Sequence, residues 1–182
     1  MCEASNLIFI GPMYETISLM GVKDVAKNTM EKAGVPTVPG SDGVVQSVDH
    51  AKEVASSVGY PVIIKASYGG GGKGIRVARN EEELVQNYKM TEQEAESAFG
   101  NKSLYIEKYI ENFRHIEIQV LGDYHGNVVH LGERDCTIQR RMQKLVEESP
   151  SPILTDAKRE EMGETAVTAA KSIDYIGAGT IE

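Results

Sequence analysis

A run of four consecutive glycines between two strand-like segments constrains the fold of this chain more than any other feature. Residues 61–67 before the run are rich in β-branched side chains, and residues 75–79 after it alternate apolar and polar side chains, which is the pattern of strands. Glycine adopts backbone conformations that other residues avoid, so it suits a tight connection. We therefore predict an antiparallel hairpin closed by a glycine loop.

The loop contains Gly69, Gly70, Gly71, Gly72, Lys73 and Gly74. Three of these glycines fit G-x-G-x-x-G, but a dinucleotide fingerprint opens a helix, whereas this loop leads into a strand. A Walker A loop is excluded because Ser67 and Gly74 stand where that motif requires glycine and Ser or Thr. Two interpretations remain: a flap whose backbone N–H groups bind phosphate, helped by Lys73 and Arg76, or a merely flexible hairpin tip.

Lys65 interrupts the apolar strand that leads into this loop. An unpaired ammonium group is costly to bury, and an anion about 4 Å away contributes on the order of 4 kcal/mol at an effective dielectric of 20. An exposed ion pair contributes only roughly 0 to 1 kcal/mol. The position favours a phosphate or carboxylate partner, and the alternative is a lysine that extends from the strand end into water.

The rest of the chain alternates helical and strand patterns, which predicts an α/β fold of the α+β kind, with antiparallel sheets and helices. Turn residues gather at 34–43, where we place a linker. The expected elements are a strand at 6–10, a helix reaching Met30, a helix between Ser47 and Gly59, helices after Asn80 and after Thr91, a strand at 103–110, a hairpin of 114–121 with 128–133, a helix after Thr155 and a strand at 177–182.

Two polar stretches are candidate binding segments. In the strand at 104–110, alternation places Glu107 between two tyrosines on one face, where it could read an adenine edge or lie on an ordinary solvated strand. Residues 132–144 carry several cations in an acidic protein, so they form either an anion-handling edge or a charged surface.

Composition narrows the function classes. The formal net charge of −8 argues against general binding to nucleic acid or anionic membranes. No apolar run approaches the roughly 20 residues of a membrane span, and no secretion signal is recognisable. Cys2 and Cys136 fit a reduced, cytoplasmic protein, and Cys136 fits a structural thiol better than a nucleophile. The histidines lack the spacing of a zinc site.

Five stretches, in order, resemble the ATP-grasp superfamily and, within it, the biotin carboxylase component of acetyl-CoA carboxylase. They are residues 9–12, 35–40, 60–74, 105–119 and 133–144 continued by 146–150. Together they span nearly the whole chain, and the last two are specific to carboxylases rather than to ATP-grasp enzymes in general.

The resemblance implies that ATP lies between two α/β units, with Mg²⁺ or Mn²⁺ bridging carboxylate and phosphate oxygens. The residues implied for the nucleotide are Lys23, Lys65, the flap at 69–74, Glu107, Lys108, Tyr109, Ile110, His115 and Gln139. Lys144 would be the catalytic residue that holds bicarbonate, and Glu182 would be the first of two metal-binding glutamates.

The same resemblance implies a reaction and its partners. Bicarbonate would attack the γ-phosphate to give carboxyphosphate, which would carboxylate biotin on a carrier protein. The partners would be this biotin carboxyl carrier protein and the carboxyltransferase subunits, and the setting would be fatty acid synthesis. The whole enzyme would be a homodimer. The expected domains are residues 1–37, the end of a preceding domain with its linker, residues 38–109, the flap subdomain, and residues 110–182, the first part of a C-terminal subdomain that continues beyond Glu182.

Other interpretations stay open at this point. They are the ATP-grasp half of a carbamoyl-phosphate synthetase, the corresponding part of a pyruvate or propionyl-CoA carboxylase, and a nucleotide-binding module without catalysis. Met142 also stands where many biotin carboxylases have histidine, so any hydrogen bond made by that histidine is absent or replaced.

The second metal-binding glutamate and the biotin-side residues of that family match no part of these 182 residues. We therefore expect the chain alone to lack bicarbonate-dependent ATPase activity, because phosphoryl transfer depends on a complete set of positioned charges. An assay of ADP release with bicarbonate checks this, and measurable turnover would contradict it.

Overall fold

A computed structural model describes residues 2–68, 73–140 and 143–182 of the chain. The structure divides into two compact units. Residues 20–113 form one, here called the inserted unit, and residues 1–19 together with 114–182 form the other, here called the outer unit.

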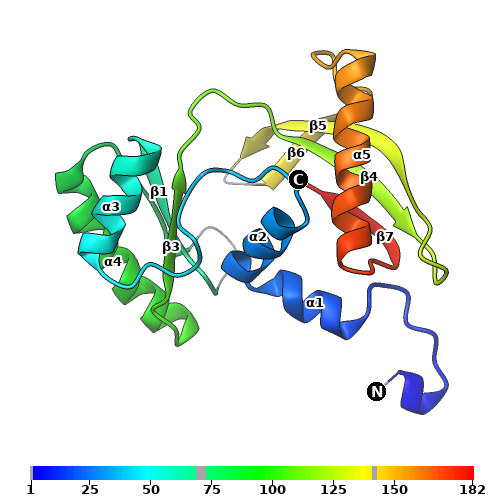
Figure 1. The fold of residues 1–182 in the computed structure, drawn as a ribbon, viewed down its shortest axis with the longest axis horizontal. Coiled ribbons are helices and arrows are strands. Elements are labelled where there is room, and N and C mark those ends of the chain that lie inside the picture. Colours follow the sequence, from blue (N-terminus) through cyan, green and yellow to red (C-terminus); the bar gives the residue numbers. More distant parts are fainter. Residues whose placement is uncertain (1, 69–72, 141–142) are drawn as a thin grey trace. The chain divides into compact units, whose positions relative to one another are not determined.

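The inserted unit is a three-stranded antiparallel sheet covered by helices on one face (Figure 1). Its elements are α2 (Lys23–Lys32), α3 (Val48–Val58), β1 (Val62–Ala66), β2 (Ile75–Ala78), α4 (Glu81–Phe99) and β3 (Leu104–Lys108), with the strands in the order β2-β1-β3. Val62, Ile64 and Ile106 are buried among the core-facing side chains of α3 and α4. Since side chains alternate across a strand, residues 63, 65, 105 and 107 belong to the opposite face.

The glycine hairpin is confirmed as far as the described residues reach. β1 and β2 pair antiparallel, from Val62 opposite Ala78 to Lys65 opposite Ile75. Gly74 has a φ of +67°, and a Cβ there would come within 2.9 Å of the Cβ of Ala66, so this end of the loop requires glycine. The predicted flap residues Gly69, Gly70, Gly71 and Gly72 lie outside the described residues.

The predicted helix caps at Ser47 and Asn80 are confirmed, but the cap predicted at Thr91 is wrong. The Ser47 side chain accepts from the His50 N–H at the start of α3, and the Asn80 side chain accepts from the Glu83 N–H at the start of α4. The second helix predicted after Thr91 does not exist, because α4 runs unbroken to a left-handed Gly100. Thr91 is buried and its hydroxyl donates to the Asn87 carbonyl one turn earlier, as an internal helical threonine does.

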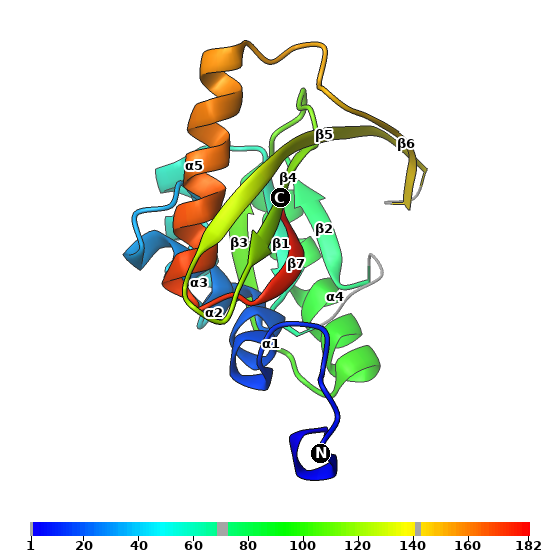
Figure 2. The same cartoon turned by 90° about the vertical axis from the view of Figure 1, so that its right-hand side faces the viewer.

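The outer unit is a four-stranded antiparallel sheet with one long helix across it (Figure 2). Its elements are a 3-10 turn (Glu3–Ser5), α1 (Tyr14–Gly21, which continues into the inserted unit), β4 (Ile116–Gly122), β5 (Val128–Arg140), β6 (Gln143–Glu148), α5 (Asp156–Ser172) and β7 (Gly177–Ile181), with the strands in the order β6-β5-β4-β7. Ile118 and Val120 pack against Ala166 and Ala170 of α5 to form its core.

The strand predicted at 6–10 is wrong: no described strand pairs with this segment, and Leu7, Ile8, Phe9 and Ile10 are exposed. The single helix predicted up to Met30 is two helices, because Val22 adopts an extended conformation between α1 and α2. Of the polar segment 132–144, residues 132–140 belong to β5 and residues 143–144 open β6. The strand predicted at 177–182 is confirmed as β7, which pairs with β4.

The predicted fold class is confirmed, with mixed helices and antiparallel sheets in both units. Within the described parts of the chain, none of the helices combines the length and the apolar character that a membrane crossing requires.

Replacing Asn80 by alanine should destabilise the protein by about 1 kcal/mol, because the first turn of α4 loses the acceptor for the Glu83 N–H. Urea denaturation measures this change. Asn80→Asp keeps a capping oxygen and should stay close to the unchanged protein. Equal losses for both variants would show that the cap is not the cause.

Candidate nucleotide site

In the inserted unit, the sheet face opposite α3 and α4 carries a carboxylate between two lysines. Lys65 on β1 places its ammonium group 2.6 Å from one oxygen of Glu107 on β3. Lys27 on α2 places its ammonium group 3.7 Å from the other oxygen. The sequence predicted an anionic partner for Lys65, and the structure supplies one from within the chain.

Lys23 stands beside this group at the first turn of α2. Its backbone N–H donates to the Ser67 carbonyl, at 3.5 Å, where β1 leaves the sheet for the glycine loop. Burial and the nearby charge of Lys65 lower the pKa of Lys23. A lysine whose charged form is disfavoured by burial and by a neighbouring cation gains from an anion placed beside it, so the start of α2 and the end of β1 suit a polyphosphate. Lys73, the remaining described cation of the loop, is exposed.

The four residues predicted to bind adenine, 107–110, lie in different environments in the structure. Glu107 faces Lys65, whereas the Lys108 ammonium donates to the carbonyls of Gly59 and Tyr60, at 2.9 and 2.8 Å. The Tyr109 N–H donates to the Pro61 carbonyl, and the Ile110 side chain is exposed. The Lys108 ammonium thus holds the turn before β1 rather than facing the Lys65–Glu107 pair.

In the outer unit, a second carboxylate is held by two cations. Glu117 on β4 is buried; it accepts from Lys144 on β6 and, at 2.5 Å, from Nε of Arg134 on β5. Lys144 also donates to Glu182, whose other oxygen lies 3.2 Å from Nε2 of His115. Three residues predicted from the sequence, His115, Lys144 and Glu182, are therefore brought together.

Gln139 lies opposite Lys144 across the β5–β6 pair. Its side-chain amide donates to the Cys136 carbonyl at 2.9 Å, which fixes it along its own strand. Its neighbour in the sequence motif, Met142, lies outside the described residues.

The charges of this second group are fixed by its hydrogen bonds. Burial works to raise the pKa of Glu117, but the bonds from Lys144 and Arg134 outweigh it and lower that pKa. The bonds to Glu117 and Glu182 raise the pKa of Lys144. Lys144 is thus a permanent cation at neutral pH, suited to holding an anion and unsuited to accepting a proton.

Sequence comparison identifies the kind of domain that carries these groups. Residues 23–182 match the family model described as the carbamoyl-phosphate synthase L chain, ATP binding domain. The chain belongs to this family. The resemblance of this ATP-binding domain to biotin carboxylases, within the ATP-grasp superfamily, is likewise confirmed.

Two curated relatives align with the whole domain. It is 63% identical over 182 residues to biotin carboxylase 1 of Bacillus subtilis, covering 40% of that protein. It is 59% identical to the 2-oxoglutarate carboxylase small subunit of Hydrogenobacter thermophilus, covering 39% of it. The chain thus spans about two fifths of the length of these relatives.

Two solved structures share its fold. One is a biotin carboxylase–β-γ-ATP complex from Campylobacter jejuni, with a TM-score of 0.93 and 54% identity over 98% of this chain and 40% of that one. The other is the biotin carboxylase domain dimer of Hydrogenobacter thermophilus 2-oxoglutarate carboxylase with MgADP, ADP and bicarbonate, with a TM-score of 0.92 and 59% identity over the same shares.

Some residues of the ATP-binding domain's two groups were missed by sequence reasoning. Lys27 reads as one polar residue of an amphipathic helix, and Glu117 and Arg134 read as outward-facing strand residues. Strand alternation places Glu117 with His115, but only the β4–β5 register, with Glu117 opposite Arg134, shows that the two charges meet. That register depends on contacts between distant segments.

Cys136 is buried in the domain, and burial, followed by the charge of Glu117, raises the pKa of its thiol. A neutral, buried thiol is a poor nucleophile, which agrees with the structural role predicted for it. Among the described residues, Glu117, Cys136 and Glu147 form a group whose spacing could hold a metal ion. Since Lys144 and Arg134 already occupy Glu117, this group does not suit magnesium, which prefers oxygen ligands.

Glu182 suits magnesium better. It is a carboxylate whose side chain is 49% exposed, at the end of β7, and Mg²⁺ usually takes one or two carboxylates together with phosphate oxygens. Lys144 also donates to Glu182, so the exposure and the oxygen ligands of this carboxylate, and not freedom from cations, are what fit it to the metal that the resemblance implies.

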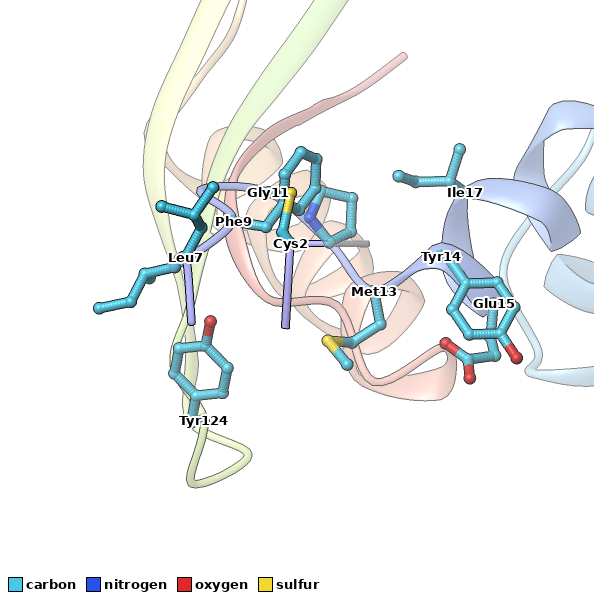
Figure 3. Close-up of a pocket in the computed structure, with 11 residues that line it drawn as sticks. Cys2, Leu7, Phe9, Gly11, Met13, Tyr14, Glu15, Ile17 and Tyr124 are labelled. Atoms are coloured by element: carbon cyan, nitrogen blue, oxygen red, sulfur yellow. The ribbon is translucent and has the colours of Figure 1, made fainter. Parts of the chain in front are cut away.

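The outer unit also contains a pocket of about 530 Å³. None of the residues of the Glu107 group or of the Glu117 group lines it. Figure 3 shows its side chains, which are mainly apolar and come from the N-terminal segment and from Tyr124. Glu15 is the charged residue among them, and no cation lines the pocket within the described parts of the chain. Its chemistry does not suit a nucleotide phosphate.

The domain should lose stability in acid through its buried carboxylates. Hydrogen bonds from Arg159 and the Ser151 N–H outweigh burial and lower the pKa of Glu133. A lowered carboxyl pKa contributes stability that is fully present above the ordinary value of about 4.3 and is lost as the pH falls below it.

Urea unfolding at about pH 7 and about pH 3.5 should show this loss, and Glu133→Gln should reduce the difference between the two pH values. Glu164→Gln, a change of an exposed glutamate on α5, is the matched control and should leave it unaltered. An unchanged pH dependence in Glu133→Gln would contradict the assignment.

Proposed function

We propose that this chain is the ATP-binding part of a biotin carboxylase, which uses ATP and bicarbonate to carboxylate biotin on a carrier protein. The observation that carries the proposal is the 63% identity to a Bacillus subtilis biotin carboxylase along all 182 residues. The ligands named for the two solved relatives, an ATP analogue in one and MgADP with bicarbonate in the other, support it.

In the inserted unit, the phosphates are assigned to Lys23, Lys65 and the loop at 69–74. Lys65 and Lys23 are cations at the point where β1 enters that loop. In a loose phosphoryl-transfer transition state, charge spreads over the transferred oxygens, so fixed cations accelerate the step mainly by electrostatic stabilisation. Adenine recognition is assigned to Glu107, Lys108, Tyr109 and Ile110. Since the Lys108 ammonium is engaged elsewhere and its backbone N–H donates to the Pro39 carbonyl, its contribution is assigned to its backbone carbonyl.

In the outer unit, Lys144 is assigned to bicarbonate. Its charge is permanent and its position is fixed by Glu117, so it can orient the anion for attack on the γ-phosphate. His115 and Gln139 are assigned to the nucleotide pocket. Glu182 would hold Mg²⁺ or Mn²⁺, and the metal, when bound, would neutralise developing phosphate charge.

The partners follow from the same proposal. They are a biotin carboxyl carrier protein, carboxyltransferase subunits and a second copy of the whole enzyme, with acetyl-CoA carboxylase and fatty acid synthesis as the setting. A reduced, cytoplasmic location and the domain boundaries after residues 37 and 109 also remain proposals.

A different biotin-dependent carboxylase is the second candidate. The chain is 59% identical to a 2-oxoglutarate carboxylase subunit and 49% identical to the pyruvate carboxylase of Bacillus subtilis. Both proteins match this chain along essentially its whole length. The matched residues therefore do not show which molecule finally accepts the carboxyl group.

Replacing Lys65 by alanine should weaken the binding of MgATP at least about tenfold, because a phosphate loses a cation in a partly desolvated site. Isothermal titration calorimetry measures the dissociation constant. Lys89→Ala, on the exposed face of α4, is the control and should bind as the unchanged chain does. Equal, negligible effects would contradict the assignment of Lys65.

A longer protein that contains this chain should release ADP faster when free biotin is added with bicarbonate. A carbamoyl-phosphate synthetase has no biotin-dependent step, so biotin should not stimulate it. Coupled measurement of ADP release separates these two classes, and a rate that ignores biotin would refute the biotin carboxylase proposal.

A further inference from the structure

Lys27 is a buried lysine with a role that neither the sequence motifs nor the comparisons assign. It lies in the second turn of α2, and its side chain is 7% exposed. Burying an ammonium group is costly unless anions compensate it, so an enclosed lysine here requires an electrostatic reason.

The nearest anions to Lys27 hold it loosely. Its Nζ lies 3.7 Å from Glu107 Oε1 and 4.0 Å from Glu31 Oε1, both longer than a hydrogen bond. Glu31 is committed elsewhere, because it accepts from the Thr37 hydroxyl at 2.5 Å. Among the described residues, Nζ of Lys27 has no hydrogen-bond partner.

Glu107 is in the opposite situation. Its side chain is 12% exposed, and its Oε2 accepts a short bond of 2.6 Å from Lys65. Lys65 therefore neutralises Glu107 directly, while Lys27 stands one step further away on the other oxygen. The carboxylate has two cations, of which one makes a direct hydrogen bond.

The space for Lys27 is kept open by a missing side chain. A Cβ on Gly40 would lie 2.9 Å from Nζ of Lys27 and 2.2 Å from the Ile106 carbonyl oxygen. Glycine at this position lets the loop before α3 pass close to β3 and still leaves room for the ammonium group.

We propose that Lys27 is the reserve counter-ion of Glu107, the positioning residue that allows Lys65 to leave Glu107 for a nucleotide phosphate. The inference rests on the proposed function, in which Lys65 binds phosphate. When Lys65 turns to the phosphate, Glu107, whose side chain is only 12% exposed, would otherwise remain unpaired. Lys27 closes the remaining gap to Glu107 and keeps it neutralised.

Without Lys27, the carboxylate and the phosphate compete for one lysine. Glu107 then retains Lys65, because leaving a buried charge unpaired is strongly unfavourable. The cost falls on phosphate binding and not on the nucleoside, since Lys65 need not move when a ligand carries no phosphate.

The test compares MgADP with adenosine by calorimetry in Lys27→Met, Lys27→Arg and the control Lys32→Met, an exposed lysine of the same helix. Lys27→Met should weaken MgADP about tenfold and leave adenosine within about twofold. Lys27→Arg keeps the charge and should restore most of the affinity, and Lys32→Met should have no effect. A general loss of structure would instead weaken both ligands.

A double-mutant cycle isolates the charge argument. In a Glu107→Gln background no carboxylate competes for Lys65, so Lys27→Met should have no further effect on MgADP affinity. The same loss in both backgrounds, or no loss in Lys27→Met alone, would overturn the proposal.

The proposed function fails separately, if the unchanged chain does not bind MgATP or if Lys65→Ala binds it normally. A chain that binds MgATP through Lys65 but tolerates Lys27→Met would retain the function and lose only the counter-ion role.

Discussion

Neutralising a carboxylate that the sheet encloses is the constraint on which the inserted unit's candidate site depends. Glu107 lies on β3 because strand alternation places Leu104 and Ile106 in the core, so residue 107 must belong to the other face. Once it is there, its charge requires cations from β1 and α2. These cations, Lys65 and Lys27, also attract phosphate to this face. The same charges therefore stabilise the fold and bind the ligand.

The outer unit solves an analogous problem with a different geometry. Glu117 is buried on β4 and is neutralised from β5 by Arg134 and from β6 by Lys144, so the two cations fix strand register as well as charge. Because Glu182 shares Lys144, the end of β7 is tied to the same carboxylate. In each unit a largely enclosed carboxylate, Glu107 or Glu117, thus contacts the lysine assigned to an anionic ligand directly.

Local patterns predicted much of this structure, and the failures have physical causes. The glycine hairpin and the caps at Ser47, Asn80 and Thr155 follow from conformational preferences of single residues, so they were found from the sequence. The division of α4 at Thr91 failed because a capping motif is also compatible with a helix interior, where the threonine hydroxyl bonds back to the chain. Sequence reasoning missed Glu117, Arg134 and Lys27. Their roles depend on contacts between segments far apart in the sequence, and the periodicity of side chains does not predict such contacts.

The exposed apolar side chains at 7–10 have a consequence for handling the protein in solution. Extended segments with unpaired backbone groups and hydrophobic side chains are templates for intermolecular strand pairing. The net charge of −8 opposes association through long-range repulsion, but salt screens that repulsion and leaves the apolar attraction intact. We therefore expect higher ionic strength to favour association of the isolated chain.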